Sequence, residues 1–332
     1  MEFFRQKTNI DFLGIKKWAA LLSLILVLAS LSCLYVKGLN WGLDFTGGYE
    51  FQLEYQTAPD LNQMNQQLEN LGLEHFDLVT FGSTKEIMLS ISPKSHFKNI
   101  KNNNSQLSQA NKANQANQAS QSEQSVQDQY KTMVAQAFPS AKILSVNFVG
   151  PQVGAELAQR GMLAMLIAVI AIMIYIALRF EMRFAFSAAV ALAHDPILIL
   201  GIFSFLQLKF DLNALAAVLA VIGYSLNDTV VVYDRFRENF RKLRHAPVIE
   251  VVNRAINDTL SRTIMTSGLT LLVVLVLFFF GGPSIHGFSL ALIIGVIVGT
   301  YSSIYVAGAL AVMLGLDREA LLPAAQKVDD LP

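Results

Sequence analysis

Six long apolar stretches limit what this sequence can fold into. Each has about 18 residues or more, and a helix of about 20 residues crosses the hydrocarbon core of a bilayer. Backbone groups in lipid must satisfy their own hydrogen bonds, so we predict that these stretches are transmembrane helices. The composition agrees, because 53% of the residues are hydrophobic and 15% are charged, as is typical of membrane proteins. The predicted spans are 18–36, 161–178, 184–206, 212–232, 264–280 and 288–314.

Lysine and arginine near the ends of the spans predict the orientation, since these residues gather on the cytoplasmic side. They cluster before the first span, near 179–183, between the fourth and fifth spans, and after the sixth, whereas the short opposite turns offer Lys209. The first span resembles a signal peptide, but its length and the lack of a clear Ala-x-Ala site favour a retained anchor. The predicted organisation is a cytoplasmic segment at 1–17, transmembrane helix 1 at 18–36, a periplasmic domain at 37–160, transmembrane helices 2 to 6 within 161–314 with a cytoplasmic loop at 233–263, and a cytoplasmic tail at 315–332.

The translocated segment has a pattern of its own. Alternating apolar residues predict strands at 49–55, 74–81, 86–92 and 142–149, and helical spacing predicts helices at 60–71 and 126–138. This βαββαβ order is that of the ferredoxin-like, or split βαβ, arrangement. An Asn/Gln/Ser run at 99–127 has too few apolar side chains for a core, so it is predicted to be a disordered insertion. The predicted fold is a polytopic α-helical membrane protein with six transmembrane helices and an α+β outer domain.

An aspartate lies inside the fourth span. Asp228 follows Asn227 in an otherwise apolar stretch that becomes charged only from Asp234 onward. A carboxylate at the centre of a membrane helix costs roughly 2.5–3.5 kcal/mol and usually faces a bundle interior or a water-filled path. Asp228 is therefore a candidate proton carrier, with Asn227 beside it. The alternative is that Asp228 lies shallow enough to reach water, or accepts a hydrogen bond that fixes helix packing.

Two further polar sites accompany it. His194, Asp195 and Pro196 fall near the middle of the third span, where proline is expected to kink the helix. A His–Asp pair can relay protons; alternatively, Asp195 accepts hydrogen bonds from a neighbouring helix while His194 faces a polar surface. Arg262 is predicted to open the fifth helix, either as a partner of Asp228 or only as an anchor at the cytoplasmic surface.

The sixth span carries small residues at every fourth position. Such a stripe lets another helix approach closely, and helix packing is the interpretation we prefer. The stripe consists of Gly295, Gly299, Ser303, Ala307, Ala311 and Gly315.

Several classes of function are disfavoured by the sequence. Lys+Arg and Asp+Glu both number 25, and this balance argues against nucleic acid as a partner. Cys33 is the only cysteine, so an internal disulfide is excluded. We find no phosphate-binding glycine loop, no metal-ligand spacing and no protease motif, so neither an enzyme nor a cofactor is predicted.

A secondary transporter fits these features better. Proton entry along the membrane potential releases about 2.3 kcal/mol per charge per 100 mV. Asp228 is expected to be ionised in one conformation, attracted to a cation such as Arg262, and protonated in another. Many transporters consist of two repeats with the working site between them, and no second copy is detected here. A partner with the other helices is therefore predicted.

Five motifs, in order along the chain, resemble those of the SecF family, a branch of the resistance-nodulation-division superfamily. Together they cover the whole chain except the polar insertion. They read Leu-Asn-Trp-Gly-Leu-Asp-Phe-Thr-Gly-Gly at 39–48, Val-Gly-Pro at 149–151, His-Asp at 194–195, Ser-Leu-Asn-Asp-Thr-Val-Val-Val-Tyr-Asp-Arg at 225–235, and Gly-Thr-Tyr-Ser-Ser at 299–303.

The resemblance implies a non-enzymatic subunit of the Sec protein-export machinery in the cell inner membrane. It implies pairing with SecD, docking near the SecYEG channel, with YajC and YidC as further candidates, and use of the proton motive force to move unfolded preproteins. In the family, an aspartate of the fourth helix and an arginine opening the fifth take part in proton passage, which match Asp228 and Arg262; Asp195 is a second candidate. The alternatives are half of a proton-coupled small-molecule or lipid exporter, and a purely structural assembly subunit.

Overall fold

The computed structural model describes residues 8–73, 76–92, 117–180, 182–243 and 245–315. The chain divides into two compact units. The membrane unit combines Met1–Asn40 with Met162–Pro332, and the soluble unit is Trp41–Gly161.

Among the described residues, six helical spans are long and apolar enough to cross a membrane, which confirms the predicted number. The last span is built from two α-helices joined by a π-helical turn, η3 (Ser303–Gly308). The spans are α1 (Lys16–Lys37, preceded by the 3-10 turn η1, Leu13–Ile15), α6 (Pro151–Arg179), α7 (Met182–Leu206), α8 (Leu212–Lys242), α9 (Val248–Phe280), and α10 (His286–Ser302) with η3 and α11 (Ala309–Met313).

The connection between the fourth and fifth spans differs from the prediction. The sequence indicates a loop at 233–263, but α8 continues to Lys242 and α9 begins at Val248. Charged residues made this segment look like a loop, although they are compatible with helix once they extend beyond the lipid. Arg262 therefore lies within α9 and does not open it, which corrects the expectation from the sequence. In the third span, α7 remains one continuous helix through Pro196.

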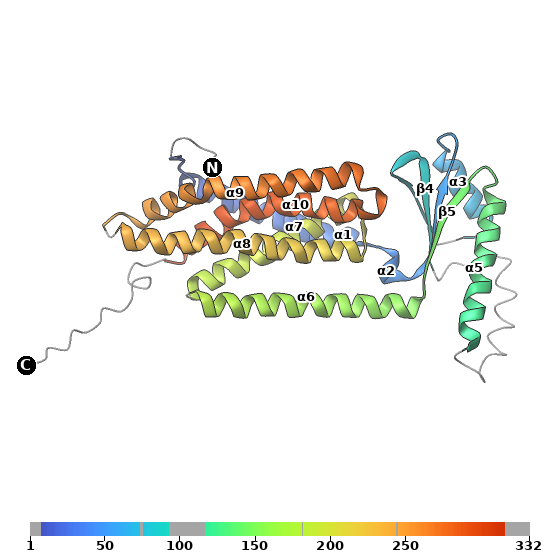
Figure 1. The fold of residues 1–332 in the computed structure, drawn as a ribbon, viewed down its shortest axis with the longest axis horizontal. Coiled ribbons are helices and arrows are strands. Elements are labelled where there is room, and N and C mark those ends of the chain that lie inside the picture. Colours follow the sequence, from blue (N-terminus) through green and yellow to red (C-terminus); the bar gives the residue numbers. More distant parts are fainter. Residues whose placement is uncertain (1–7, 74–75, 93–116, 181, 244, 316–332) are drawn as a thin grey trace, which may run out of the picture. The chain divides into compact units, whose positions relative to one another are not determined.

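The centre of the membrane unit is formed by α7, α8 and α10. In the most apolar 18-residue stretch of α7, and in that of α8, half of the residues are buried inside the protein, against 6% in that of α6. Helices α8, α9 and α10 pack pairwise, and α7 packs against α1, α8 and α10 (Figure 1). Close approach of α8 and α10 depends on glycine, because a Cβ added at Gly295 would overlap the side chain of Val221.

The soluble unit contains a sheet whose strand order is β3-β4-β2-β5, with every neighbouring pair antiparallel. Phe51 of β2 lies opposite Leu89 of β4 and Val146 of β5, which sets the register. The elements follow the predicted order: β2 (Gly48–Glu54), α3 (Leu61–Asn70), β3 (Phe76–Phe81), β4 (Ser83–Ile91), α5 (Asn117–Ala137) and β5 (Lys142–Val149). The remaining short elements are β1 (Asn40–Trp41), α2 (Leu43–Thr46), β6 (Lys209–Phe210) and the 3-10 turn η2 (Pro283–Ile285).

The hydrophobic core of the soluble unit lies between one face of the sheet and its two helices. Alternate residues of β2 point into it, as expected for a strand with period 2. The helices contribute residues at helical spacing, such as Met64 and Leu68 of α3 and Tyr130 and Val134 of α5. The predicted disordered insertion at 99–127 is partly wrong, because α5 begins at Asn117 and its first turns are helical. Residues 99–116 of that insertion lie outside the described residues.

The turn at Gly47, between α2 and β2, packs against the start of α6. Gly47 ends α2 at φ = 68°, a conformation that favours glycine. A Cβ on Gly47 would lie 2.8 Å from Cα of Pro151, and a Cβ on Gly154 would lie 2.9 Å from the backbone nitrogen of Gly47. Two of the sequence motifs, at 39–48 and 149–151, therefore meet in one tightly packed turn.

Gly295→Ala is expected to destabilise the membrane unit by about 1–3 kcal/mol, because the new methyl group overlaps Val221. The apparent free energy of unfolding is measured on the purified chain in detergent. Gly268→Ala is the matched control, since a Cβ there meets no atom within 4 Å. Val221→Ala should restore part of the loss in the double variant. Equal stability of both glycine variants would contradict close packing at Gly295.

Candidate functional site

Asp228 lies on the buried face of α8. Its side chain is 7% exposed. Thr263 Oγ1 of α9 donates to Asp228 Oδ1 at 2.9 Å, and Ser303 Oγ donates to Oδ2 at 3.1 Å. Both partners are neutral hydroxyl groups, and Asp228 forms no ion pair within the part of the chain that the structure describes.

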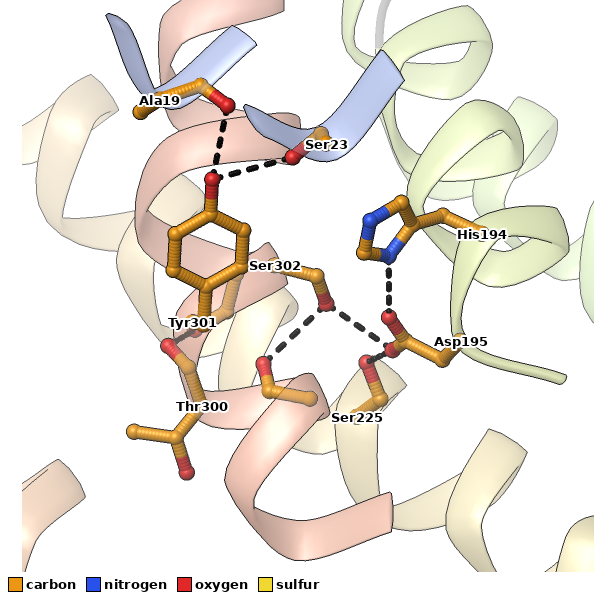
Figure 2. Close-up of polar contacts among 10 residues, drawn as sticks. Ala19, Ser23, His194, Asp195, Ser225, Thr300, Tyr301 and Ser302 are labelled. Atoms are coloured by element: carbon orange, nitrogen blue, oxygen red, sulfur yellow. Dashed lines mark hydrogen bonds and ion pairs between the residues drawn. The ribbon is translucent and has the colours of Figure 1, made fainter. Parts of the chain in front are cut away.

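Asp195 of α7 forms a second buried carboxylate centre and is fully buried. Its Oδ2 accepts hydrogen bonds from Ser225 Oγ at 2.5 Å and Ser302 Oγ at 2.9 Å. Its Oδ1 lies 2.9 Å from Nδ1 of His194. Figure 2 shows these partners converging on Asp195 from α7, α8 and α10. One carboxylate therefore links the three central helices.

Two adjacent serines connect the centres. Ser302 ends α10 and donates to Asp195, and Ser303 begins η3 and donates to Asp228. Gly299 leaves room for this arrangement, because a Cβ there would lie 3.2 Å from Cβ of Ser225 and 3.6 Å from Asp195 Oδ2. A π-helical turn inside a membrane helix often marks a functional position. Here it begins at the serine that contacts Asp228.

The hydroxyl partners suit either charge state of the carboxyl groups. A serine hydroxyl has one proton and two lone pairs. Ser303 Oγ also lies 3.0 Å from the carbonyl oxygen of Thr300, and Ser302 Oγ lies 3.2 Å from that of Gly299. If Asp228 gains a proton, its O–H can donate to Ser303 while Ser303 donates to the carbonyl group. Protonation therefore leaves no buried polar atom unpaired at Ser303.

His194 has one nitrogen without a partner. Its Nε2 is buried and makes no hydrogen bond with any described residue. When Asp195 is ionised, Nδ1–H donates to Oδ1, so Nε2 of the neutral ring is a free acceptor. The ring lies beside Tyr301, with centroids 6.4 Å apart, and the Tyr301 hydroxyl donates to the carbonyl oxygen of Ala19 at 2.8 Å (Figure 2). The His194 ring therefore lies at the contact between α1, α7 and α10.

The residues predicted from the sequence do not all meet. Arg262 is exposed on α9, and its neighbour Thr263 makes the contact with Asp228. Asn227 is exposed on α8, because consecutive helical residues point about 100° apart and Asp228 faces inward. Gly295, Gly299, Ser303 and Ala307 are all buried along the last span.

Sequence reasoning missed three hydroxyl partners, Ser225, Thr263 and Ser302. Ser225 precedes Asp228 by three residues, a spacing that places both on one helix face. The spacing indicates that Ser225 shares the buried face of α8 with Asp228, although its hydroxyl donates to Asp195. Thr263 and Ser302 approach the carboxylates from other helices, so only the tertiary structure identifies them. Ser303 was singled out for packing alone, and its hydrogen bond to Asp228 adds a second role.

Ser302→Ala is expected to lower the apparent free energy of unfolding by about 1–3 kcal/mol, because buried Asp195 loses one of its donors. Ser289→Ala is the control on the same helix. Ser289 is equally buried, but its hydroxyl donates to the carbonyl oxygen of Ile285, the residue just before α10, so little change is expected. Denaturant unfolding of the purified chain in detergent measures both. Equal losses would contradict a special role for the bond to Asp195.

Comparison with known proteins identifies the family. The family described as "Protein export membrane protein SecD/SecF, C-terminal" matches residues 129–317, and the "SecD/SecF GG Motif" matches residues 34–59. The chain is 41% identical to "Protein translocase subunit SecF" of Haemophilus influenzae, over 97% of this chain and 92% of that protein. It is 42% identical to the protein of the same name from Pseudomonas aeruginosa, over 98% of each.

A solved structure gives the same result. The crystal structure of SecDF, a translocon-associated membrane protein from Thermus thermophilus, matches with a TM-score of 0.79 and 33% identity over 95% of this chain. The chain spans 40% of the length of that SecDF chain. With six apolar helical spans and relatives named as translocase subunits, this is a multi-pass membrane protein that belongs to the SecF family.

Proposed function

We propose that this chain is a proton-coupled, non-enzymatic subunit that assists Sec-dependent protein translocation. Asp228 is the proton carrier in this proposal, and Asp195 with His194 forms a second proton-accepting group. The observation that supports it is the pairing of a buried carboxyl group with hydroxyls alone. A carboxylate that served only to fix packing would gain more from a cationic or backbone N–H partner, because such bonds are stronger.

The proposed switch follows from the hydroxyl partners. Protonation of Asp228 removes a charge from an apolar bundle, and Ser303 can turn its hydroxyl toward the carbonyl group of Thr300. The neutral centre then favours a conformation that the ionised centre does not. Arg262, which immediately precedes Thr263, is the proposed counter-charge in the conformation where Asp228 is ionised. Each proton that enters along the membrane potential supplies about 2.3 kcal/mol per 100 mV.

The proposed setting is the cell inner membrane, with both termini in the cytoplasm and the soluble unit as a ferredoxin-like periplasmic domain. Helix α6 offers apolar surface that the chain itself leaves exposed, and we propose that SecD helices cover part of it. The further proposed partners are the SecYEG channel, YajC, YidC and unfolded preproteins. Membrane lipid surrounds the remaining faces.

The proposal is tested with Asp228→Asn, which keeps the shape of the side chain but cannot ionise. Protein export is measured in cells where the variant replaces the natural protein. We expect export to fall to the level of cells that lack the protein, while abundance and the pull-down of SecD remain normal. Asp258→Asn is the matched control, because Asp258 is exposed on α9 and an asparagine there can still accept the hydrogen bond from Asn239. Protein export in cells with this variant should be unchanged.

Three outcomes are informative. Normal assembly with failed export supports proton carriage by Asp228. Normal export with normal assembly means that Asp228 is structural, and proton coupling through it is then rejected. Failed assembly favours a packing role, in which case Asp228→Glu, which can ionise, should not restore export any better than Asp228→Gln.

A further inference from the structure

A charged cavity lies at the end of α6, against the last turns of α8. Its volume is about 470 Å³. The lining side chains are Arg179, Asp234, Arg237, Glu238, Arg241 and Lys242. Four are cationic and two are anionic, so the cavity attracts an anion.

An aromatic ring fixes the two arginines nearest the membrane. Phe180 is 6% exposed, and the guanidinium carbons of Arg179 and Arg237 lie 5.2 and 5.9 Å from its ring centroid. Asp234 lies between them, with Oδ1 3.0 Å from Arg179 Nη2 and 3.8 Å from Arg237 Nη1. Stacking on the ring and sharing one carboxylate hold both guanidinium groups in place.

The other charges leave one cation available. Glu238 is already paired with Arg235 at 2.7 Å and with Lys242 at 2.6 Å. Arg241, one turn beyond Arg237, forms no ion pair with any described residue. The cavity therefore has a positive charge that its own carboxylates do not neutralise.

The position of the cavity in the membrane unit indicates which kind of molecule carries the anion. The cavity begins where the apolar parts of α6 and α8 end, the level at which lipid phosphates lie. The last turns of α6 expose Ile174, Tyr175 and Leu178, which are 55%, 49% and 84% exposed. Acyl chains can cover these side chains while the phosphate reaches the arginines. A free phosphate ion would make no use of this apolar surface.

We propose that this cavity binds the phosphate group of an anionic phospholipid. Guanidinium groups bind phosphate through two parallel N–H···O bonds. Arg237 and Arg241 supply these donors, and Phe180 and Asp234 position Arg237. The lipid would join the ends of α6 and α8.

The test measures binding of labelled phosphatidylglycerol to the full-length chain in detergent. The double variant Arg237→Gln/Arg241→Gln should weaken binding at least tenfold. Lys17→Gln/Arg254→Gln is the control, because it removes the same charge from exposed residues outside the cavity, and its binding should be unchanged. Arg237→Lys/Arg241→Lys keeps the charge and should retain part of the affinity. Unfolding temperatures confirm that each variant is folded.

Competition experiments distinguish a lipid phosphate from a free phosphate ester as the bound anion. Unlabelled phosphatidylglycerol should displace the labelled lipid, whereas phosphatidylcholine and soluble glycerol phosphate at equal concentration should not. Equal weakening by both double variants would mean that only general charge attracts the lipid, and this would overturn the proposal. Unchanged binding in the cavity variant, or equal competition by glycerol phosphate, would overturn it as well. Export is not measured, so the result is independent of proton coupling.

Discussion

Burial of two carboxyl groups in an apolar helix bundle is the constraint on which the membrane unit depends. A carboxylate at such a depth costs roughly 2.5–3.5 kcal/mol, and hydroxyl groups from neighbouring helices offset this cost. Gly295 and Gly299 allow α8 and α10 to approach closely, and this brings Ser303 within hydrogen-bond distance of Asp228. Close packing and polar pairing are therefore linked, since a wider separation of α8 and α10 would move the Ser303 hydroxyl away from Asp228.

The junction of α10 and η3 (Ser302 and Ser303) connects the two buried carboxyl groups, because Ser302 donates to Asp195 and Ser303 donates to Asp228. Consecutive residues of a regular α-helix point about 100° apart, and here they contact two carboxyl groups that lie on different helices. Each serine also has an alternative acceptor within its own helical segment. The junction can therefore respond to the charge of either centre by rotating a hydroxyl group. In the proposed mechanism, this rotation links proton binding to the backbone of the last span.

Much of the fold could be predicted from the sequence, because apolar length and periodicity are local properties. The six spans, the strand at 142–149 and the order of elements in the soluble unit follow from them. The loop at 233–263 was wrong, since charge alone does not distinguish a loop from a helix that continues into water. The buried site was predicted only in part. Asp195 and Asp228 are conspicuous in apolar spans, but Thr263 and Ser302 become partners only through tertiary packing, which no local pattern encodes.

The central claim is that Asp228 changes its protonation state inside the folded bundle. Infrared difference spectroscopy of the full-length chain in lipid, recorded between alkaline and acidic buffer, measures the carbonyl stretch of protonated carboxyl groups directly. The account predicts a buried carboxyl band on acidification that is reduced in Asp228→Asn and unchanged in Asp258→Asn. A spectrum of Asp228→Asn that retains the full band, or a natural protein that shows none, would contradict it.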